Sequence, residues 1–505
     1  MPKTWPNTRI APAPLRPAPA YSAASVGLFF ALLSPSIAAQ DGYDYFADNR
    51  RLIDKGVQAV LSCNGLFTSS RSLEQVFEQE LAYLGDRVLG SAEGGPYTVH
   101  AKEQAVSVGG GEHGETITAA FREGIGCVVM PPDAPLSMID ELPEIRSAAD
   151  VDPPSIAWPM GDADALAEPD ADVDRAALEA AAEWAFERDT PEQDTISLLV
   201  VHRGRIIFER YADGFDHLTR TRTWSTAKSI AATLIGMQVD AGRMELDAPL
   251  PFDWNPAMIN ADSDPRRKIT LRHVLNMSSG LYPVDSFGME YATGSGLAYW
   301  AGASSVEGMR DRGLVREPGT HWDYENYDTL LAVYALKLTL GSEAAYHAYP
   351  RTALLDRIGM RNTLLSTDRF GDFILSSQVY TNARDLARFG LLYLNNGLWQ
   401  GERLISEEWV DFVRTPAPAS AVRGHDYGGQ FWLVPDDRKG EVPTDAYSTA
   451  GNRGQYVIIA PSHDLVIVRR GLDYGRQGFN RWDLLREVIK AIPEAIPQAI
   501  AETQR

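Results

Sequence analysis

The sequence contains few cysteines and few lysines, and no apolar run in it is long enough to cross a membrane comfortably. Only two of its 505 residues are cysteine, and their spacing is not that of a metal site. Eight residues are lysine, and the 47 basic and 68 acidic residues give a formal net charge of −21. Such an acidic chain does not suit nucleic acid or anionic lipid, so we expect neither as a partner.

The N-terminus has the pattern of a secretory signal. Three basic residues precede a short apolar run and then a group of small residues, and the first acidic residue is Asp41. We therefore predict that residues 1–38 are a signal peptide cleaved after Ala38, and that the protein is exported to the periplasm or secreted. Removing the three positive charges takes the net charge from −21 to −24. A disordered leader rich in proline and alanine is the alternative.

The two cysteines are Cys63 and Cys127. In an exported protein an even pair suggests one disulfide, which would cross-link the N-terminal region. Two buried thiols are the alternative.

Composition and periodicity divide the chain into segments. Residues 39–130 are predicted to form a small α/β unit without recognisable chemistry. Residues 131–174 contain eight prolines and twelve acidic residues, which favours a linker or a loosely wrapped arm. In residues 175–495, two strands come early and three come late, with a helical insert at about 253–375. We predict one antiparallel sheet flanked by helices and closed by both ends of this domain, an α/β (α+β) fold.

One Ser-x-x-Lys motif, formed by Ser225 and Lys228, precedes the apolar run 230–237. In a helix that begins at Ser225, the two side chains lie one turn apart on the same face. A serine hydroxyl becomes a nucleophile when a nearby base takes its proton, and a lysine becomes that base when burial lowers its pKa. The alternative is an N-cap serine with a surface lysine, but the apolar run leaves little polar face for a surface lysine.

Four stretches carry a resemblance to a known superfamily. Residues 225–228 resemble the first sequence box of the serine β-lactamases and penicillin-binding proteins, and residues 269–281, 318–327 and 381–390 resemble other shared stretches. The similarity covers roughly residues 175–495 and is closest in style to class C-like esterases and 6-aminohexanoate-dimer hydrolases. It implies a β-lactamase/transpeptidase-like fold and an acyl-enzyme formed on Ser225.

Tyr324 and Asn326 match the second box, Tyr-x-Asn. The resemblance implies that Tyr324 is a second proton carrier and that Asn326 orients Lys228 or the substrate. We expect the phenol beside an ammonium to ionise more easily. Because Tyr-x-Asn also occurs at Tyr380 and Tyr393, a buried structural tyrosine is the alternative.

The third box departs from the family pattern Lys-Thr-Gly, because Thr449 stands where lysine is expected before Ala450 and Gly451. That lysine resembles the group that meets the carboxylate of β-lactams and cell-wall peptides, so its absence puts both substrates in doubt. The backbone N–H groups of Ser225 and of a residue near Asn452 are still expected to form an oxyanion hole. Arg453 could replace the lost charge, although a solvated turn arginine is the simpler interpretation.

The sequence therefore predicts an exported serine hydrolase that cleaves a small-molecule ester or amide and needs no cofactor or metal. His273 and His425 are not needed, because Lys228 and Tyr324 fill the acid–base roles. One alternative is a β-lactamase or D-alanyl-D-alanine carboxypeptidase. Another is a non-catalytic binding or scaffold protein that retains the fold. The substrate, the oligomeric state and the role of the N-terminal unit are left open.

Overall fold

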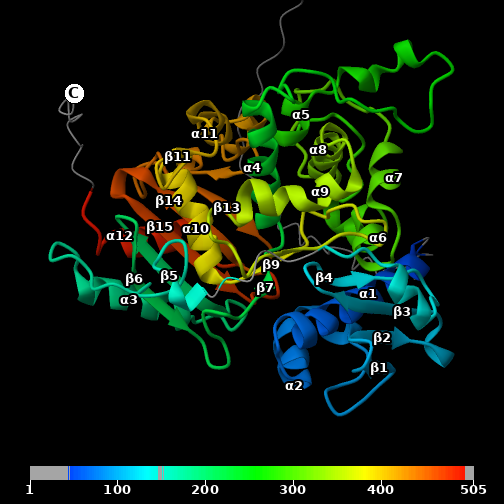
Figure 1. Ribbon diagram of the computed structural model, residues 1–505, viewed down its shortest axis with the longest axis horizontal. Coiled ribbons are helices and arrows are strands. Elements are labelled where there is room, and N and C mark those ends of the chain that lie inside the picture. Colours follow the sequence, from blue (N-terminus) through cyan, green and yellow to red (C-terminus); the bar gives the residue numbers. More distant parts are fainter. Residues whose placement is uncertain (1–43, 45, 146–150, 152, 495–505) are drawn as a thin grey trace, which may run out of the picture. The chain divides into compact units, whose positions relative to one another are not determined.

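A six-stranded antiparallel sheet, on the left of Figure 1, forms the core of the C-terminal domain. The structure is a computed structural model that describes residues 44, 46–145, 151 and 153–494, so the predicted signal peptide lies outside the described residues. The strand order is β12-β13-β14-β15-β5-β6. The strands are β5 (Thr195–His202), β6 (Arg205–Tyr211), β12 (Trp432–Leu433), β13 (Tyr447–Gly451), β14 (Gln455–Ala460) and β15 (Leu465–Gly471). Because β15 pairs with β5, placing Leu465 opposite His202, the sheet joins the two ends of the domain as predicted.

Helices cover both faces of this sheet, which explains why its central strands are apolar on both sides. On β5, Leu198 and Val200 belong to one buried core, and Leu199 and Val201 belong to the other. Helices α4 and α10 pack on one face, and α3 and α12 lie on the opposite face. Their bounds are α3 (Arg175–Phe186), α4 (Thr226–Asp240), α10 (Ala383–Leu394) and α12 (Arg481–Ile489). The arrangement confirms the predicted antiparallel sheet flanked by helices.

A largely helical region lies between α4 and α10 in the sequence. Its helices are α5 (Leu271–Leu275), α6 (Ser295–Trp300), α7 (Ser305–Arg310), α8 (Asn326–Thr339) and α9 (Glu343–Pro350), and α11 (Glu407–Arg414) follows α10. A small sheet in the order β7-β9-β8 is made of β7 (Thr221–Arg222), β8 (Leu364–Leu365) and β9 (Val379–Thr381). A hairpin is formed by β10 (Leu398–Trp399) and β11 (Glu402–Arg403).

The N-terminal part packs one helix on a four-stranded antiparallel sheet (Figure 1). Its elements are α1 (Ala47–Cys63), α2 (Leu73–Gln75), β1 (Tyr97–His100), β2 (Ala105–Gly109), β3 (Thr116–Arg122) and β4 (Gly126–Val129). The sequence predicts one regular helix over residues 72–84. The chain instead forms the short α2, a π-helical turn and a 3₁₀ turn that contains Gly85 at φ +55°. Glycine adopts this left-handed backbone without a Cβ penalty, so the segment bends there.

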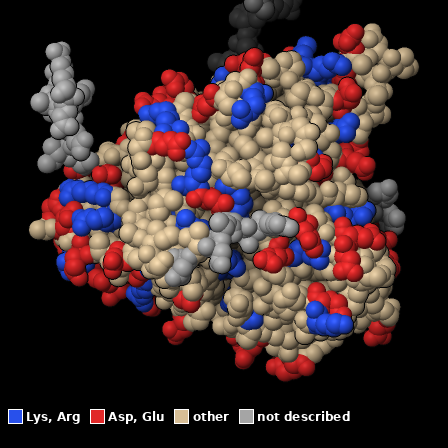
Figure 2. Space-filling view, in the orientation of Figure 1, with Lys and Arg blue, Asp and Glu red and all other residues tan. Residues whose placement is uncertain are grey.

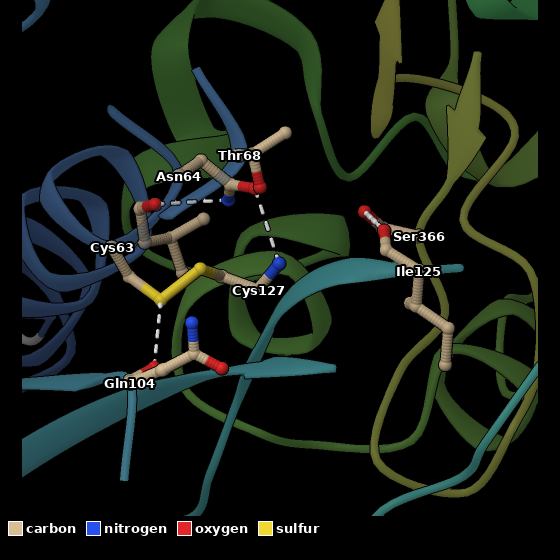
Figure 3. Close-up of a disulfide and its surroundings, with 8 residues drawn as sticks. Cys63, Asn64, Thr68, Gln104, Ile125, Cys127 and Ser366 are labelled. Atoms are coloured by element: carbon tan, nitrogen blue, oxygen red, sulfur yellow. Dashed lines mark hydrogen bonds between the residues drawn. A yellow bond between two sulfur atoms is a disulfide. The ribbon is translucent and has the colours of Figure 1, made fainter. Parts of the chain in front are cut away.

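A disulfide joins Cys63, at the end of α1, to Cys127 on β4, with 6.0 Å between the Cα atoms (Figure 3). The side chain of Asn64 lies beside it, accepting from the backbone N–H of Cys127 and donating to the carbonyl of Val60. The hydroxyl of Ser366 donates to the carbonyl of Ile125 at 2.8 Å, which ties this sheet to the chain leading into the small β7-β9-β8 sheet.

The N-terminal unit also packs closely against the helical region. A Cβ built on Gly56 of α1 would lie 1.7 Å from the carbonyl oxygen of Trp300, so only glycine allows α1 to approach α6 this closely. The described residues from Phe46 onward accordingly form a single compact unit.

The described part of the acidic, proline-rich segment lies against the main domain. The Arg388 guanidinium on α10 donates to the carbonyls of Pro159 and Gly161 and pairs with Asp162 at 2.7 Å. Acidic and basic side chains alternate over the face shown in Figure 2 without a large patch of one sign. Within the described ranges, no helix is both long and apolar enough to span a membrane.

Candidate active site

The backbone turn before α4 exposes the hydroxyl of Ser225. Trp224 adopts φ +50°, a left-handed conformation that is uncommon for a residue with a bulky side chain. Ser225 follows at the N-cap position of α4, yet its side chain makes no capping hydrogen bond. The hydroxyl therefore does not cap the start of the helix. It lies instead in a cavity described below. Trp224 itself is held between neighbouring side chains, with the Arg222 guanidinium 3.9 Å from its ring centroid.

Lys228 lies one turn along α4 and is only 1% exposed. Its Nζ is 3.1 Å from Ser225 Oγ, 2.7 Å from Asn326 Oδ1 and 2.8 Å from the carbonyl oxygen of Ser376. In a neutral amine the two N–H bonds satisfy Asn326 and Ser376, which leaves the nitrogen lone pair for the hydroxyl proton of Ser225. The surface lysine of the alternative interpretation is excluded by this burial.

Burial lowers the pKa of Lys228 to about 7. The negative charges of Glu290 and Asp285 act in the opposite direction, and burial outweighs them. A lysine with a pKa near neutrality is present partly as the free amine, which is the form that accepts a proton.

Glu290 and Asp285 also hold Asn326 in place. Asn326 Nδ2 donates to Glu290 Oε2 at 3.1 Å and to Ser295 Oγ at 3.0 Å, and the Asn326 backbone N–H donates to Asp285 Oδ2 at 3.2 Å. With Nδ2 donating to these two groups, Oδ1 of Asn326 faces Lys228. Neither acid was predicted from the sequence, because Asp285 precedes a 3₁₀ turn, Glu290 lies within that turn, and neither belongs to a motif. Both reach the site only through the fold.

Tyr324 approaches from the loop before α8. The Lys228 Nζ lies 4.9 Å from the centroid of its ring, and Tyr324 and Ser225 line the same cavity. Burial raises the pKa of Tyr324 above the usual value, and the neighbouring Ser225 side chain offsets part of this increase. The expectation that this phenol ionises more easily is therefore wrong, because burial disfavours the phenolate more strongly than the surrounding groups favour it. Tyr324 is held as a neutral phenol, which can donate a proton.

The end of β13 lies against the nucleophile turn. A Cβ on Gly451 would be 2.0 Å from the carbonyl oxygen of Thr223 and 3.2 Å from the backbone nitrogen of Ser225. Asn452 follows at an exposed position beside the same cavity. The backbone of residues 451–452 is thus close enough to the N–H of Ser225 for both segments to face one substrate oxygen.

Thr449 points away from this cavity. Its hydroxyl is fully buried, lies 3.1 Å from the Thr226 hydroxyl and accepts from the Val457 backbone N–H at 3.2 Å. The residue of β13 that lines the cavity is Ala450. Position 449 therefore offers the substrate neither a charge nor a direct contact.

Arg453 is buried, so the interpretation as a solvated turn arginine is wrong. It is 4% exposed, and its guanidinium donates to the carbonyls of Gln79 and Glu80 in the N-terminal unit and to those of Leu472 and Asp473. The turn is fastened to two other segments through this side chain, which therefore does not replace the missing lysine.

A cavity of about 370 Å³ connects these groups. Its lining comprises Ser225, Asp285, Glu290, Tyr324, Asn326, Trp432, Ala450, Gly451, Asn452, Tyr456 and Arg481. Trp432, Trp322, Tyr324 and Tyr427 form an aromatic cluster with ring centroids between 5.0 and 6.2 Å apart. Of the aromatic residues that the sequence places near the boxes, Trp432 lines the cavity, whereas Trp224 lies behind the nucleophile turn.

The two histidines lie outside the cavity lining. His273 completes a capping box with Thr270 at the start of α5, and His425 pairs with Asp436. Among the described residues, no group of three or more His, Cys, Asp or Glu side chains is arranged to hold a metal ion.

The fold and these residues define a class of protein, and comparison with known families agrees. A family model described as Beta-lactamase matches residues 185–469, more than half of the chain, and the chain belongs to this family. The family is one of serine hydrolases with the β-lactamase fold that act on small-molecule substrates. The predicted superfamily and fold are thereby confirmed.

The individual proteins that this chain resembles have low sequence identity to it. The 6-aminohexanoate-dimer hydrolase of Paenarthrobacter ureafaciens is 24% identical over 302 residues, covering 56% of this chain and 74% of that protein. The structure of a D-stereospecific amidohydrolase from Streptomyces aligns with a TM-score of 0.47 at 17% identity, over 63% of this chain and 98% of that chain. A family VIII carboxylesterase aligns with a TM-score of 0.47 at 14% identity, over 65% and 98%.

Proposed function

We propose that this protein is an exported serine hydrolase that cleaves an ester or amide through an acyl-enzyme on Ser225. The observation that carries the proposal is the environment of Lys228. Its amine is buried, its pKa is lowered to about 7, and it lies 3.1 Å from Ser225 Oγ with its other hydrogen-bonding positions occupied by fixed acceptors.

The reaction begins with proton transfer from Ser225 to neutral Lys228. As Ser225 Oγ bonds to the substrate carbonyl carbon, Lys228 Nζ takes the hydroxyl proton and becomes an ammonium. Asn326 Oδ1 and the Ser376 carbonyl accept hydrogen bonds from that ammonium, and Glu290 and Asp285 stabilise its charge. The negative oxygen of the tetrahedral intermediate accepts hydrogen bonds from the backbone N–H of Ser225 and of a residue near Asn452.

Tyr324 completes the proton path to the leaving group. Its neutral phenol donates a proton to the departing oxygen or nitrogen and recovers one from the Lys228 ammonium. A water molecule then attacks the acyl carbon, and the same groups work in reverse to release the acid and restore the Ser225 hydroxyl. The chain's own residues supply each of these proton transfers.

The alternative reaction is β-lactam or D-alanyl-D-alanine peptide cleavage at the same site. Position 449 is threonine and faces Thr226, so the cation that such substrates meet on this strand is missing. A small ester or a linear amide, such as the dimer named in the 6-aminohexanoate-dimer hydrolase, is the better candidate.

Export is supported by two independent features. The basic, apolar and small residues at the start of the sequence have the order of a signal peptide, and a disulfide joins Cys63 to Cys127. N-terminal sequencing of protein recovered from the cell envelope is expected to begin at Ala39 or Gln40. An intact Met1 would contradict export.

The first prediction tests the nucleophile. The purified protein is expected to hydrolyse short p-nitrophenyl esters faster than a chromogenic cephalosporin, and to be labelled by a fluorophosphonate probe. Ser225→Ala should abolish both turnover and labelling, and Lys228→Ala should be nearly as severe because the two residues act as a unit. Tyr324→Phe keeps the ring and should lower the rate by about 10²- to 10⁴-fold.

Ser229→Ala is a matched control, since Ser229 lies on the same helix and its hydroxyl donates to the carbonyl of Gln430 instead of reaching the cavity. That variant should still be labelled. Turnover that survives Ser225→Ala would overturn the assignment, whereas a parent protein that cleaves none of the substrates would favour the scaffold interpretation.

A further inference from the structure

Arg481, the first residue of α12, lines the same cavity as Ser225. It is partly exposed, but its Nε is buried without a hydrogen-bond partner among the described residues. Within that part of the chain it also forms no salt bridge. A buried N–H without an acceptor carries a desolvation cost, so the uncommitted guanidinium indicates a group that is completed by a ligand.

The protein surrounds this guanidinium with aromatic rings and not with acids. The Cζ of Arg481 lies 4.9 Å from the ring centroid of Trp482, 5.2 Å from that of Trp432 and 5.9 Å from that of Tyr456. These rings orient the side chain and attract its charge through their faces, yet they accept none of its in-plane N–H bonds.

The acidic groups near the cavity are already engaged elsewhere. Asp426, the carboxylate with the strongest influence on Arg481, forms two hydrogen bonds with Arg423 at 2.9 and 3.1 Å. Asp285 and Glu290 bind Asn326 and face Lys228. Arg481 is therefore a cation on the cavity wall that retains its capacity to bind an external anion.

We propose that Arg481 binds a carboxylate of the substrate, supplying from helix α12 the positive charge that strand β13 lacks at Thr449. A guanidinium pairs with a carboxylate through two parallel N–H donors, and the surrounding rings fix its plane for this purpose. The two carboxylates in the same small cavity disfavour a doubly charged phosphate more strongly than a singly charged acid. The inference rests on the proposed hydrolysis at Ser225 and narrows its substrate to esters or amides that carry a carboxylate.

The test compares substrates that differ only in charge. Mono-p-nitrophenyl glutarate has a carboxylate on the acyl side, and p-nitrophenyl valerate is its neutral partner of equal chain length. The butyrate ester of p-hydroxybenzoate has the carboxylate on the leaving-group side, and the butyrate ester of methyl p-hydroxybenzoate is its neutral partner. The measured quantity is the ratio of kcat/KM for the anionic and neutral member of each pair.

The parent protein is expected to prefer the anionic member of at least one pair. Arg481→Gln should lower that ratio by about 10- to 100-fold, the range of one charge-assisted bidentate contact, while turnover of the neutral ester continues. Arg481→Lys keeps the charge without the planar fork and should give an intermediate ratio. Which pair responds identifies the side of the scissile bond that faces α12.

Arg486→Gln is the matched control, because Arg486 lies on the same helix α12 but pairs with Asp483 and Glu487 and does not line the cavity. It should leave both ratios unchanged. Equal ratios in the parent and in both Arg481 variants would overturn the proposal while leaving Ser225-dependent hydrolysis intact. Turnover of the neutral esters that survives Ser225→Ala would instead overturn the proposed function itself.

Discussion

Lys228 is subject to two opposing electrostatic effects. Burial disfavours its ammonium form, whereas the carboxylates of Glu290 and Asp285 favour it, and the resulting pKa is about 7. The side-chain amide of Asn326 hydrogen-bonds with both Lys228 and Glu290. A single amide therefore fixes the position of Lys228 and of the carboxylate that raises the pKa of Lys228. If Ser225 is the nucleophile, as proposed, its reactivity depends on residues that do not contact the substrate carbonyl.

The second prediction concerns pH dependence. The free amine of Lys228 is the active form, so kcat/KM for a neutral ester should rise as pH increases through about 7 and then level off. Glu290→Gln removes a charge that raises the pKa of Lys228, so its profile should rise at lower pH. Initial rates measured between pH 5 and 9 would show this shift, and a shift toward higher pH would contradict it.

Glu317→Gln is the control for that profile. The Glu317 side chain is 64% exposed and pairs only with Lys268 in the described part of the chain. Its variant should reproduce the parent curve. Because burial raises the pKa of Tyr324, no loss of activity from its ionisation is expected within the measured range.

Contacts between residues close together in the sequence were easier to predict than contacts between residues far apart in it. The nearness of Ser225 and Lys228 follows from one helical turn, so the sequence was sufficient to predict it. The state of Tyr324 was predicted in the wrong direction, because its pKa depends on burial that no spacing reveals. Glu290, Asp285 and Arg481 were missed because they belong to no motif and meet the site only after the chain has folded. The catalytic roles themselves remain predictions.

At the scale of elements, the contact between β13 and the turn before α4 sets the width of the proposed oxyanion site. Gly451 is the residue at which the two segments approach most closely, because any Cβ there would collide with the carbonyl of Thr223. Glycine is needed at this position only because a side chain would not fit. Its backbone φ is not in the left-handed region, so other residues could adopt the conformation. The distance between the two sets of backbone N–H groups thus depends on the absence of one side chain.

The third prediction follows from this contact. Gly451→Ala should force β13 and the nucleophile turn apart and lower kcat/KM on neutral esters by about 10- to 100-fold, if 1–3 kcal/mol of overpacking acts on the transition state. Gly313→Ala is the control, because a Cβ at Gly313 meets nothing within 4 Å. Full activity of the Gly451→Ala protein would show that the strand end does not shape the site.

The principal strands were predictable from their short apolar runs and from the turns at residues 451–454 and 461–464, and β13, β14 and β15 lie where these patterns placed them. The segment after Ser72 was less predictable, because its apolar spacing suits a regular helix while the chain changes to a π-helical turn at Val76 and to a 3₁₀ turn at Ala82. The burial of Arg453 could not be predicted either, because its side chain binds the carbonyls of Gln79 and Glu80, which no local sequence pattern identifies as partners.

At the scale of the whole molecule, the N-terminal unit contacts both sides of the oxyanion site. Arg453 fastens the turn after β13 to residues 79 and 80, and Tyr83 meets the ring of Trp224 edge-on at 5.8 Å. Arg453 is part of the turn after β13, and Trp224 directly precedes Ser225 in the sequence. Stability of the N-terminal unit is therefore linked to the geometry of the active site.

The fourth prediction concerns the disulfide within that unit. Cys63 and Cys127 are 64 residues apart, and closing a loop of this size restricts the unfolded chain by about 4 kcal/mol in the chain-entropy treatment. The Cys63→Ser/Cys127→Ser protein should unfold at a lower temperature than the oxidised parent and lose ester hydrolysis on heating before it unfolds completely. Differential scanning calorimetry and activity along the same temperature ramp would measure both.

The reduced parent should behave like the double variant, and the double variant should not respond to a reductant. Ser62→Ala, next to the disulfide on the buried face of α1, controls for local packing. Equal thermal stability of the parent with and without reductant would contradict a stabilising role for the bridge.

The pairing of β15 with β5 has a consequence for how the chain is made. Strands β5 and β6 leave the ribosome long before β15, because helices α4 to α11 lie between β6 and β15 in the sequence. Until then β5 presents a row of unpaired backbone groups on the side that β15 will occupy, the kind of edge to which other chains add. Because α4, which follows Ser225, packs against this sheet, each nascent chain passes through a long interval in which Ser225 has been synthesised but the candidate site is not yet assembled.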